Sequence, residues 1–315
     1  MRIGIDMMGG DFAPLEAVKG IKLFLSSNER NTQLILFGDE AIIRPLLEAH
    51  GIDQSKFQIV HAPEVIGMHE HPTKALREKT ASSIALGFHY LSSGKTDSFI
   101  SAGNTGAMLV GAMFSIRAID GVSRPTISTI VPKENGDTGL LLDVGINADC
   151  KPEHLNQFAT LGSIYARNIL GISEPRVGLI NLGEEEGKGN MLAQATYPLL
   201  KENSQINFIG NIEGRDLLID KADVMICEGF TGNVLLKLLE SLYDITRRKK
   251  IESEYFDQFD FEKHGGTPVL GVAKPVIIGH GISGALSFSN MIALSLKMAD
   301  TDVLGKMTAA FKANG

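Results

Sequence analysis

Polar and apolar segments recur in a fixed order along the chain. A short apolar run is followed by a loop rich in Gly, Asn and Asp, and then by a stretch with helical periodicity. Apolar runs without alternation are typical of strands buried on both faces. Strands that alternate with helices predict a doubly wound α/β sheet with helices on both faces. The predicted strands are residues 2–6, 33–37, 97–101, 176–182, 223–227 and 275–278; the predicted helices are 15–25, a segment reaching residue 50, 108–119, 191–201, 234–245 and a segment from about 285.

Two further apolar runs follow each other directly, at residues 126–131 and 139–144, with only a short polar turn between them. This spacing predicts a hairpin, so we expect a mixed sheet. In open α/β sheets the ligand binds beyond the carboxyl ends of the strands. The Gly-rich loops all follow predicted strands, so we expect a site assembled from several of them.

Three of these loops are candidates for binding an anion. They are MGGDFAP at residues 8–14, SAGNTGA at 101–107 and EGFTGN at 228–233. Backbone N–H groups at a helix N-terminus, with the side chains of Ser101, Asn104 and Thr105, can hold a phosphate. The alternative is a set of tight turns whose Asn and Thr residues cap helices. For a single loop that alternative is favoured, whereas three loops at one sheet edge favour an anion site.

The loop GEEEGKGN, residues 183–190, is not a nucleotide-binding P-loop, because only three residues separate Gly183 from Gly187 and no Ser or Thr follows the lysine. Lys188 nevertheless has the compact charge that suits phosphate. The three glutamates before it are expected near a helix N-terminus, where negative charge is stabilised. His280 lies between two glycines after a strand and is expected either to line the site or to bond backbone groups.

Composition and charge exclude several classes of protein. The chain has 315 residues, with 30 Lys and Arg against 37 Asp and Glu, which disfavours a basic nucleic-acid-binding domain over the whole chain and leaves only a local basic patch open. Two cysteines, Cys150 and Cys227, exclude a disulfide framework and a multi-cysteine zinc site and favour an intracellular protein. We expect no metal at His69 and His71, because a third ligand is missing. No apolar stretch approaches the length of a membrane span.

Taken together, these segments resemble the bacterial phosphate acyltransferase family of fatty acid/phospholipid synthesis proteins. The matching segments, in order, are DMMGGDFAP, SAGNTGA, LLLDVGINADCKPEHLNQFA, RVGLINLGEEEGKGN, FIGNIEGRD, ADVMICEGFTGN and the stretch at 265–271. This chain departs from the family at Ile282, where HGIS replaces HGSS or HGGS, and in a short segment at about 234–263. The resemblance covers nearly the whole chain and implies a single domain, residues 1–315, with a fold similar to isocitrate and isopropylmalate dehydrogenases.

The resemblance implies a reaction that makes acyl phosphate from acyl-(acyl carrier protein) and orthophosphate, without a metal or other cofactor. It names Lys188 and Asn233 as candidate catalytic residues, and His280 joins them as the histidine nearest to a site loop. The candidate residues for phosphate and thioester binding are Gly10, Asp11, Ser101, Gly103, Asn104, Thr105 and Gly232. Positioning and preformed hydrogen-bond donors suit this chemistry, because phosphate is already a nucleophile and a thiolate leaves readily.

The expected partners follow from charge and resemblance. Acyl carrier protein is acidic, so docking to this acidic chain requires basic residues, for which Lys74, Arg77, Arg247, Arg248, Lys249 and Lys250 are the candidates. We expect a cytoplasmic homodimer in which the segment at 234–263 projects at the interface; its shortness disfavours peripheral membrane attachment. A downstream membrane acyltransferase is a further expected partner. The alternatives are a phosphotransacetylase acting on acyl-CoA, a metal- and nicotinamide-dependent dehydrogenase, and a non-catalytic scaffold.

Overall fold

The computed structural model describes residues 1–27 and 32–312, which form two compact units. Unit 1 comprises Met1–Ala118 and Phe261–Asp300, and unit 2 comprises Ile119–Asp260 and Thr301–Gly315. The expectation of a single domain over residues 1–315 stays a prediction. None of the helices within the described ranges is both long and apolar enough to span a bilayer.

Unit 1 contains a sheet with strand order β3-β2-β1-β4-β11-β10. All neighbouring strands are parallel except β10, which is antiparallel to β11. The strands are β1 (Arg2–Asp6), β2 (Gln33–Gly38), β3 (Phe57–His61), β4 (Ser98–Ser101), β10 (Thr267–Leu270) and β11 (Val276–Ile278); the helices are α1 (Leu15–Ser27), α2 (Glu40–Ala49), α3 (Pro72–Glu78), α4 (Ser83–Ser92), α5 (Thr105–Gly111), α9 (Phe261–His264) and α10 (Ala285–Asp300). Short helical turns at Gln54–Lys56 and Ala112–Ile116 complete the unit.

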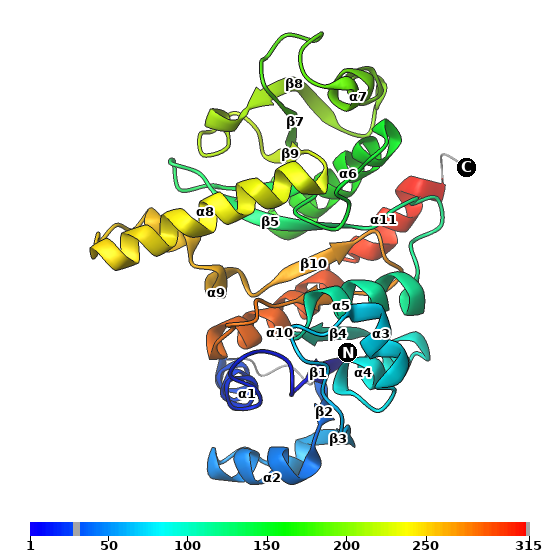
Figure 1. Ribbon diagram of the computed structural model, residues 1–315, viewed down its shortest axis with the longest axis vertical. Coiled ribbons are helices and arrows are strands. Elements are labelled where there is room, and N and C mark those ends of the chain that lie inside the picture. The colour runs from blue at the N-terminus through cyan, green and yellow to red at the C-terminus, as the bar shows by residue number, and fades with distance from the viewer. Residues whose placement is uncertain (28–31, 313–315) are drawn as a thin grey trace. The chain divides into compact units, whose positions relative to one another are not determined.

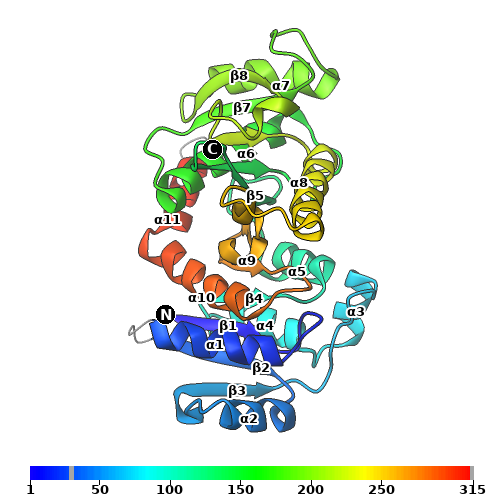
Figure 2. The ribbon, with the colours of Figure 1, turned by 90° about the vertical axis from the view of Figure 1, so that its left-hand side faces the viewer.

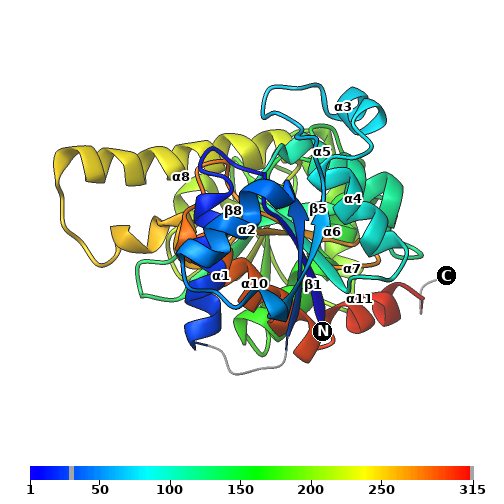
Figure 3. The same ribbon diagram turned by 90° about the horizontal axis from the view of Figure 1, so that it is seen from below.

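Helices cover both faces of this sheet, as the alternating pattern predicts. Figure 3 shows α1 and α10 on one side of β1 and α4 on the other. The rings of Phe37 and Phe88 meet that of Phe99 edge-on, with ring centres 5.9 and 5.2 Å apart. Gly87 in α4 permits this packing, because a Cβ there would lie 2.2 Å from the Phe99 ring.

Unit 2 contains five paired strands in the order β5-β6-β9-β7-β8 (Figure 1). Its strands are β5 (Thr126–Pro132), β6 (Thr138–Leu142), β7 (Arg176–Asn181), β8 (Asn207–Glu213) and β9 (Val224–Ile226); its helices are α6 (Pro152–Tyr165), α7 (Met191–Glu202), α8 (Gly229–Lys249) and α11 (Val303–Lys312). Short helical turns lie at Ala166–Leu170, Gly214–Asp216 and Phe256–Phe259. The predicted hairpin is confirmed, because β5 and β6 pair antiparallel while the other strand pairs of the unit are parallel. Figure 2 shows α6 and α8 on opposite sides of these strands.

Two local features differ from the sequence expectation. The segment EGFTGN is not a loop, because α8 begins at Gly229 with the Glu228 side chain as its N-cap. The three glutamates at 184–186 do not sit at a helix N-terminus, because α7 begins only at Met191. They lie in the preceding loop and form ion pairs with Lys221, Lys188 and Lys201.

Candidate functional site

The loop after β7 presents Lys188 to solvent. Asn181, the last residue of β7, donates from Nδ2 to the Lys188 carbonyl oxygen at 3.0 Å. Gly189 follows with φ +95°, and a Cβ there would lie 2.2 Å from Asn181 Oδ1, so only glycine fits. The loop is therefore held through its backbone. The Lys188 side chain is 49% exposed and its Nζ lies 3.8 Å from Glu185 Oε1, so the ammonium can approach a substrate.

Asn233 lies in the first turns of α8, beside the end of β6. Its Nδ2 donates to the Val144 carbonyl oxygen at 3.2 Å. An amide nitrogen carries two N–H groups, and the described residues use one of them. Gly232 allows this close approach, because a Cβ there would lie 1.8 Å from the Asp143 carbonyl oxygen. The close packing of α8 on the end of β6 explains Gly232 without a ligand contact.

Asp143 organises the loop that Asn233 contacts, and the sequence analysis did not single it out. The carboxylate is fully buried and accepts from the backbone N–H of Ile127 at 3.2 Å and of Asn147 at 2.7 Å. The Asn147 side chain donates to it as well, at 2.9 Å. An aspartate directly after the apolar run of β6 was the available signal. Strands β6, β9 and β7 are parallel neighbours, so their carboxyl ends lie at one edge of the sheet. Asp143 follows β6, Asn233 follows β9 and the Lys188 loop follows β7, so all three lie at that edge.

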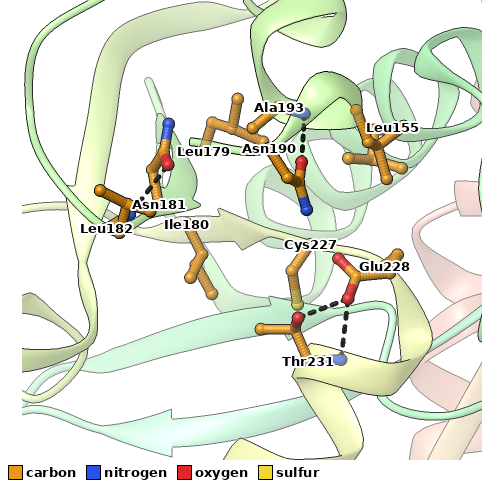
Figure 4. A pocket seen from close by; sticks show the side chains of 11 residues that line it. Leu155, Leu179, Ile180, Asn181, Leu182, Asn190, Ala193, Cys227, Glu228 and Thr231 are labelled. Atoms are coloured by element: carbon orange, nitrogen blue, oxygen red, sulfur yellow. Dashed lines mark hydrogen bonds between the residues drawn. The ribbon is translucent and has the colours of Figure 1, made fainter. Parts of the chain in front are cut away.

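A pocket of about 270 Å³ opens at this edge, where β7 and β9 end and α7 and α8 begin (Figure 4). Its lining comprises Leu155, Leu179, Ile180, Asn181, Leu182, Asn190, Leu192, Ala193, Cys227, Glu228 and Thr231. Glu228 caps α8 by accepting from the Thr231 backbone N–H at 3.0 Å and from the Thr231 hydroxyl. Asn190 caps α7 by accepting from the Ala193 N–H at 2.8 Å. The sequence analysis did not predict this pocket.

In unit 1, the loops after β1, β4 and β11 meet. The Asp11 N–H donates to the Gly281 carbonyl oxygen at 2.7 Å, which joins the first loop to the third. Gly9 and Gly103 approach so closely that a Cβ on Gly9 would lie 2.6 Å from the Gly103 nitrogen. The predicted residues Gly10, Asp11, Ser101, Gly103, Asn104 and Thr105 thus belong to loops that share one edge of the unit 1 sheet.

Asp6, a buried carboxyl missed by the sequence analysis, supports these loops. The Ser101 hydroxyl donates to Asp6 Oδ2 at 2.6 Å and accepts from the Gly103 N–H at 2.9 Å. The Met8 N–H donates to Asp6 Oδ1 at 2.9 Å. Burial raises the pKa of Asp6, although the hydrogen bonds from Ser101 and from the loop backbone act in the opposite direction. Ser101 is fully buried, so it braces the loop from within.

Asn104 and His280 occupy different environments in these loops. Asn104 is 4% exposed, and its Oδ1 caps α5 through the Ala107 N–H at 2.9 Å. Its Nδ2 donates to the carbonyl oxygens of Gly67, Met68 and Glu70 at 3.0, 3.2 and 3.1 Å. His280 is exposed, and its Nδ1 accepts from the Ile282 N–H at 3.4 Å. Thr105, the first residue of α5, is also exposed.

The family model described as "Fatty acid synthesis protein" matches residues 1–306. The chain belongs to this family. Similar curated relatives are named phosphate acyltransferase. The relative from Dictyoglomus turgidum is 41% identical, over 98% of this chain and 96% of its own, and that from Aquifex aeolicus is 42% identical, over 99% and 97%. The family prediction made from the sequence is therefore confirmed, and with it the enzyme class.

Solved structures similar to this fold include two phosphotransacetylases. One, from Streptococcus pyogenes, has a TM-score of 0.67 at 17% identity and covers 95% of this chain and 94% of its own. The other, the EutD phosphotransacetylase from Staphylococcus aureus, has a TM-score of 0.65 at 15% identity, with 94% of each chain covered. At these identities the likeness concerns the fold, and it confirms the predicted α/β class.

The basic residues considered for carrier-protein docking are exposed in both units. Lys74 and Arg77 lie on α3 in unit 1. Arg247, Arg248 and Lys249 form the last turn of α8 in unit 2, and Lys250 caps it. The candidate docking residues thus form two exposed basic segments, one in each unit.

Neither cysteine has the environment of a nucleophile. Burial, together with Asp143 and Glu228, raises the pKa of Cys150 to about 12 and that of Cys227 well above its ordinary value. These raised pKa values keep both thiols protonated near neutral pH. Because a thiol must ionise to attack a thioester, neither cysteine is suited to be the nucleophile. The described residues also contain no group of three or more His, Cys, Asp or Glu that could hold a metal ion.

Proposed function

We propose that this protein transfers an acyl group from acyl-(acyl carrier protein) to orthophosphate. A phosphate oxygen attacks the thioester carbonyl, the C–S bond breaks, and acyl phosphate and the free carrier thiol are released. The observation that carries the proposal is the exposed Lys188 ammonium on a fixed, glycine-flanked loop at the same sheet edge as Asn233. A cation and a preformed amide donor are the groups that such a reaction needs.

The candidate residues take distinct roles in this proposal. Lys188 neutralises phosphate or the oxyanion that develops on the thioester carbonyl. Asn233 donates its second N–H to that oxygen. His280 and the loop amides near Gly10 and Gly103 contribute to binding the substrate anion. Because both thiols have raised pKa values, a direct attack by phosphate is favoured over a covalent acyl-cysteine.

The carrier protein is the proposed acyl donor because the chain displays clusters of exposed basic residues despite its net charge of −7. Lys74, Arg77 and the residues at 247–250 would steer the acidic carrier to the site. We further propose that the protein acts as a homodimer in the cytoplasm and passes acyl phosphate to a membrane acyltransferase.

An end-point assay tests the proposal. Purified protein, palmitoyl-(acyl carrier protein) and orthophosphate are mixed, acyl phosphate is trapped with hydroxylamine, and the released thiol is titrated. Both signals should depend on phosphate. Lys188→Ala should lower turnover by a factor of roughly 10², whereas Lys237→Ala, an exposed lysine on α8, should leave it unchanged.

Three results would contradict the proposal. Activity with coenzyme A thioesters but not with carrier-protein thioesters would assign the protein to the phosphotransacetylase alternative. A folded Lys188→Ala variant with full turnover would remove Lys188 from the mechanism. Absence of turnover with both kinds of thioester, while the carrier protein still binds, would favour the scaffold alternative.

A further inference from the structure

The pocket at the edge of unit 2 is mainly apolar inside. Leu155 comes from α6, Leu179 and Ile180 from β7, and Leu192 and Ala193 from α7. Its volume of about 270 Å³ corresponds to roughly nine methylene-sized groups, if each takes the ~30 Å³ of a liquid water molecule. The pocket can therefore hold an alkyl segment of intermediate length.

The charge of the lining argues against phosphate as the occupant. The Glu228 carboxylate forms part of the wall, and none of the described lining residues is cationic. Burial keeps the thiol of Cys227 protonated by raising its pKa, so that part of the wall is neutral. An anion would be repelled by Glu228, whereas a neutral apolar group would be accepted.

One polar group in the wall is available to a ligand. The Oδ1 atom of Asn190 is occupied by the cap of α7, through the Ala193 N–H at 2.8 Å. Figure 4 shows that its amide nitrogen points the other way, toward the pocket. The Nδ2 atom has no acceptor among the described residues, so it can donate to a ligand carbonyl oxygen.

The pocket is joined directly to the loop that carries the candidate catalytic lysine. Asn181 lines the pocket and donates to the Lys188 carbonyl oxygen at 3.0 Å. Asn190, two residues after Lys188, belongs to the same segment. A carbonyl group bound by Asn190 would therefore lie at the end of the pocket that carries this loop.

We propose that this pocket binds the acyl chain next to the thioester, with the Asn190 amide donating to the thioester carbonyl oxygen. This inference rests on the proposed function, which it deepens by naming an acyl subsite and a further substrate-contacting residue. An alkyl chain suits the apolar lining better than the amide-rich pantetheine arm, whose polar groups would be left unpaired there. Carbons beyond about the ninth would extend out of the pocket.

The test narrows the pocket and measures chain-length dependence. Ala193→Leu places three more carbons in the pocket, and Ala195→Leu makes the same change on an exposed position of the same helix. With acetyl-, octanoyl- and palmitoyl-pantetheine and saturating phosphate, Ala193→Leu should lower kcat/KM about tenfold or more for the two longer thioesters and by less than about threefold for acetyl. Ala195→Leu should resemble the unsubstituted protein with all three.

Two further variants keep the test decisive if Ala193→Leu does not fold. Leu182 is 71% exposed, so Leu182→Ala will fold and should lower kcat/KM several-fold for octanoyl- and palmitoyl-pantetheine but not for acetyl-pantetheine. Asn190→Asp keeps an oxygen to cap α7 but removes the donor. It should lower kcat/KM about tenfold for all three thioesters without changing the melting temperature. Equal values for Asn190→Asp and the unsubstituted protein would overturn the role of Asn190.

Binding measured without phosphate separates this inference from the proposed function. Calorimetry with octanoyl-pantetheine should show binding to the unsubstituted protein and to Ala195→Leu, and about tenfold weaker binding to Ala193→Leu. If this difference is seen but no thioester turns over, the proposed function fails and the subsite stands. If turnover is normal but folded Ala193→Leu and Leu182→Ala retain full octanoyl binding and activity, the acyl subsite is refuted.

Discussion

Replacing Asp223 with Asn should strongly destabilise unit 2. The Lys133 ammonium lies 2.6 Å from Asp223 Oδ1, and the two side chains are only 1% and 8% exposed. Arg176 adds bonds from Nε and from a terminal guanidinium nitrogen, both at 2.9 Å. Burial alone would raise the pKa of Asp223, but the hydrogen bonds from Arg176 and Lys133 outweigh it and hold the pKa well below its ordinary value.

The loss of stability in Asp223→Asn depends on the groups that still contact the Lys133 ammonium in the variant. Removing one partner of a buried ion pair costs roughly 3–5 kcal/mol, because the other charge stays buried and uncompensated. Two features reduce this cost. Asp220 Oδ1 remains 3.0 Å from Lys133 Nζ, and asparagine keeps one oxygen acceptor. We therefore expect the free energy of unfolding to fall by about 2–3 kcal/mol at neutral pH.

The ion pair of Asp223 and Lys133 also determines how the stability of the protein changes with pH. Because the folded-state pKa of Asp223 is lowered, its contribution to stability is complete above the unfolded-state pKa of about 3.9 and is lost as the pH falls toward the folded-state value. The stability gap between the unsubstituted protein and Asp223→Asn should be constant from about pH 5 to about pH 8. Below the unfolded-state pKa it should narrow by about 1.4 kcal/mol for each pH unit.

Denaturant titration combined with hydrogen exchange measures this effect. Exchange of amides in β7 and β9 reports on unit 2 alone, which matters because a chain with two compact units can unfold in two transitions. Glu240→Gln is the control, since it breaks an exposed pair with Lys237 and should cost less than about 1 kcal/mol. A loss for Asp223→Asn no larger than this control, or a gap that does not narrow in acid, would refute the reasoning.

Three further predictions concern other parts of the molecule. Asn104→Ala should lower the stability of unit 1 by about 2–4 kcal/mol, because it removes a helix cap and the donor to three carbonyl oxygens; Asn104→Asp, which keeps the cap, should cost less in the same denaturation measurement. Cys227 should react with iodoacetamide far more slowly than free cysteine at neutral pH, since burial raises its pKa; rapid labelling of the folded protein would contradict this. Lys74→Glu combined with Arg77→Glu should raise KM for acyl-(acyl carrier protein) and weaken its salt dependence, while KM for phosphate stays unchanged.

The alternation of apolar runs and helical stretches was sufficient to predict the fold class. Strands such as β2 and β9 are buried along nearly their whole length, so their apolar composition is unambiguous. The hairpin of β5 and β6 was equally accessible, because the connection between the two runs is too short for a helix. These features depend on local sequence, which a pattern of residue types records directly.

The start of α8 could not be predicted in the same way. Glycine has a low helix propensity, so the two glycines in GFTGN indicate a loop. The structure places them in the helix because Gly232 lies against the Asp143 carbonyl oxygen and Gly229 lies against the backbone of Asn147. Both contacts join segments more than eighty residues apart, and tertiary packing here overrides local preference.

The pocket could not be predicted from the sequence either, because it is also formed by segments that lie far apart along the chain. Its walls come from Leu155, from the segment between Leu179 and Ala193, and from the segment between Cys227 and Thr231. The residue pattern of each segment alone is typical of a strand end or a helix start and does not indicate a pocket. Asp6 was hidden too, because an aspartate at the end of an apolar strand signals a site loop without revealing that its carboxyl lies buried beneath that loop.

The structure also separates asparagines that look alike in the sequence. Asn104, Asn190 and Asn233 all lie where a strand leads into a helix, and each was compatible with either capping or substrate binding. The side chain of Asn104 is fully used within the protein, by one cap and three carbonyl oxygens. Asn190 uses only its side-chain oxygen, which caps α7, and Asn233 uses one N–H, which donates to the Val144 carbonyl oxygen. Because a substrate can bind only to donors that the fold leaves unused, Asn190 and Asn233 are the stronger candidates for contact with the thioester, and the role of Asn104 is to hold the loop at 67–70 in place.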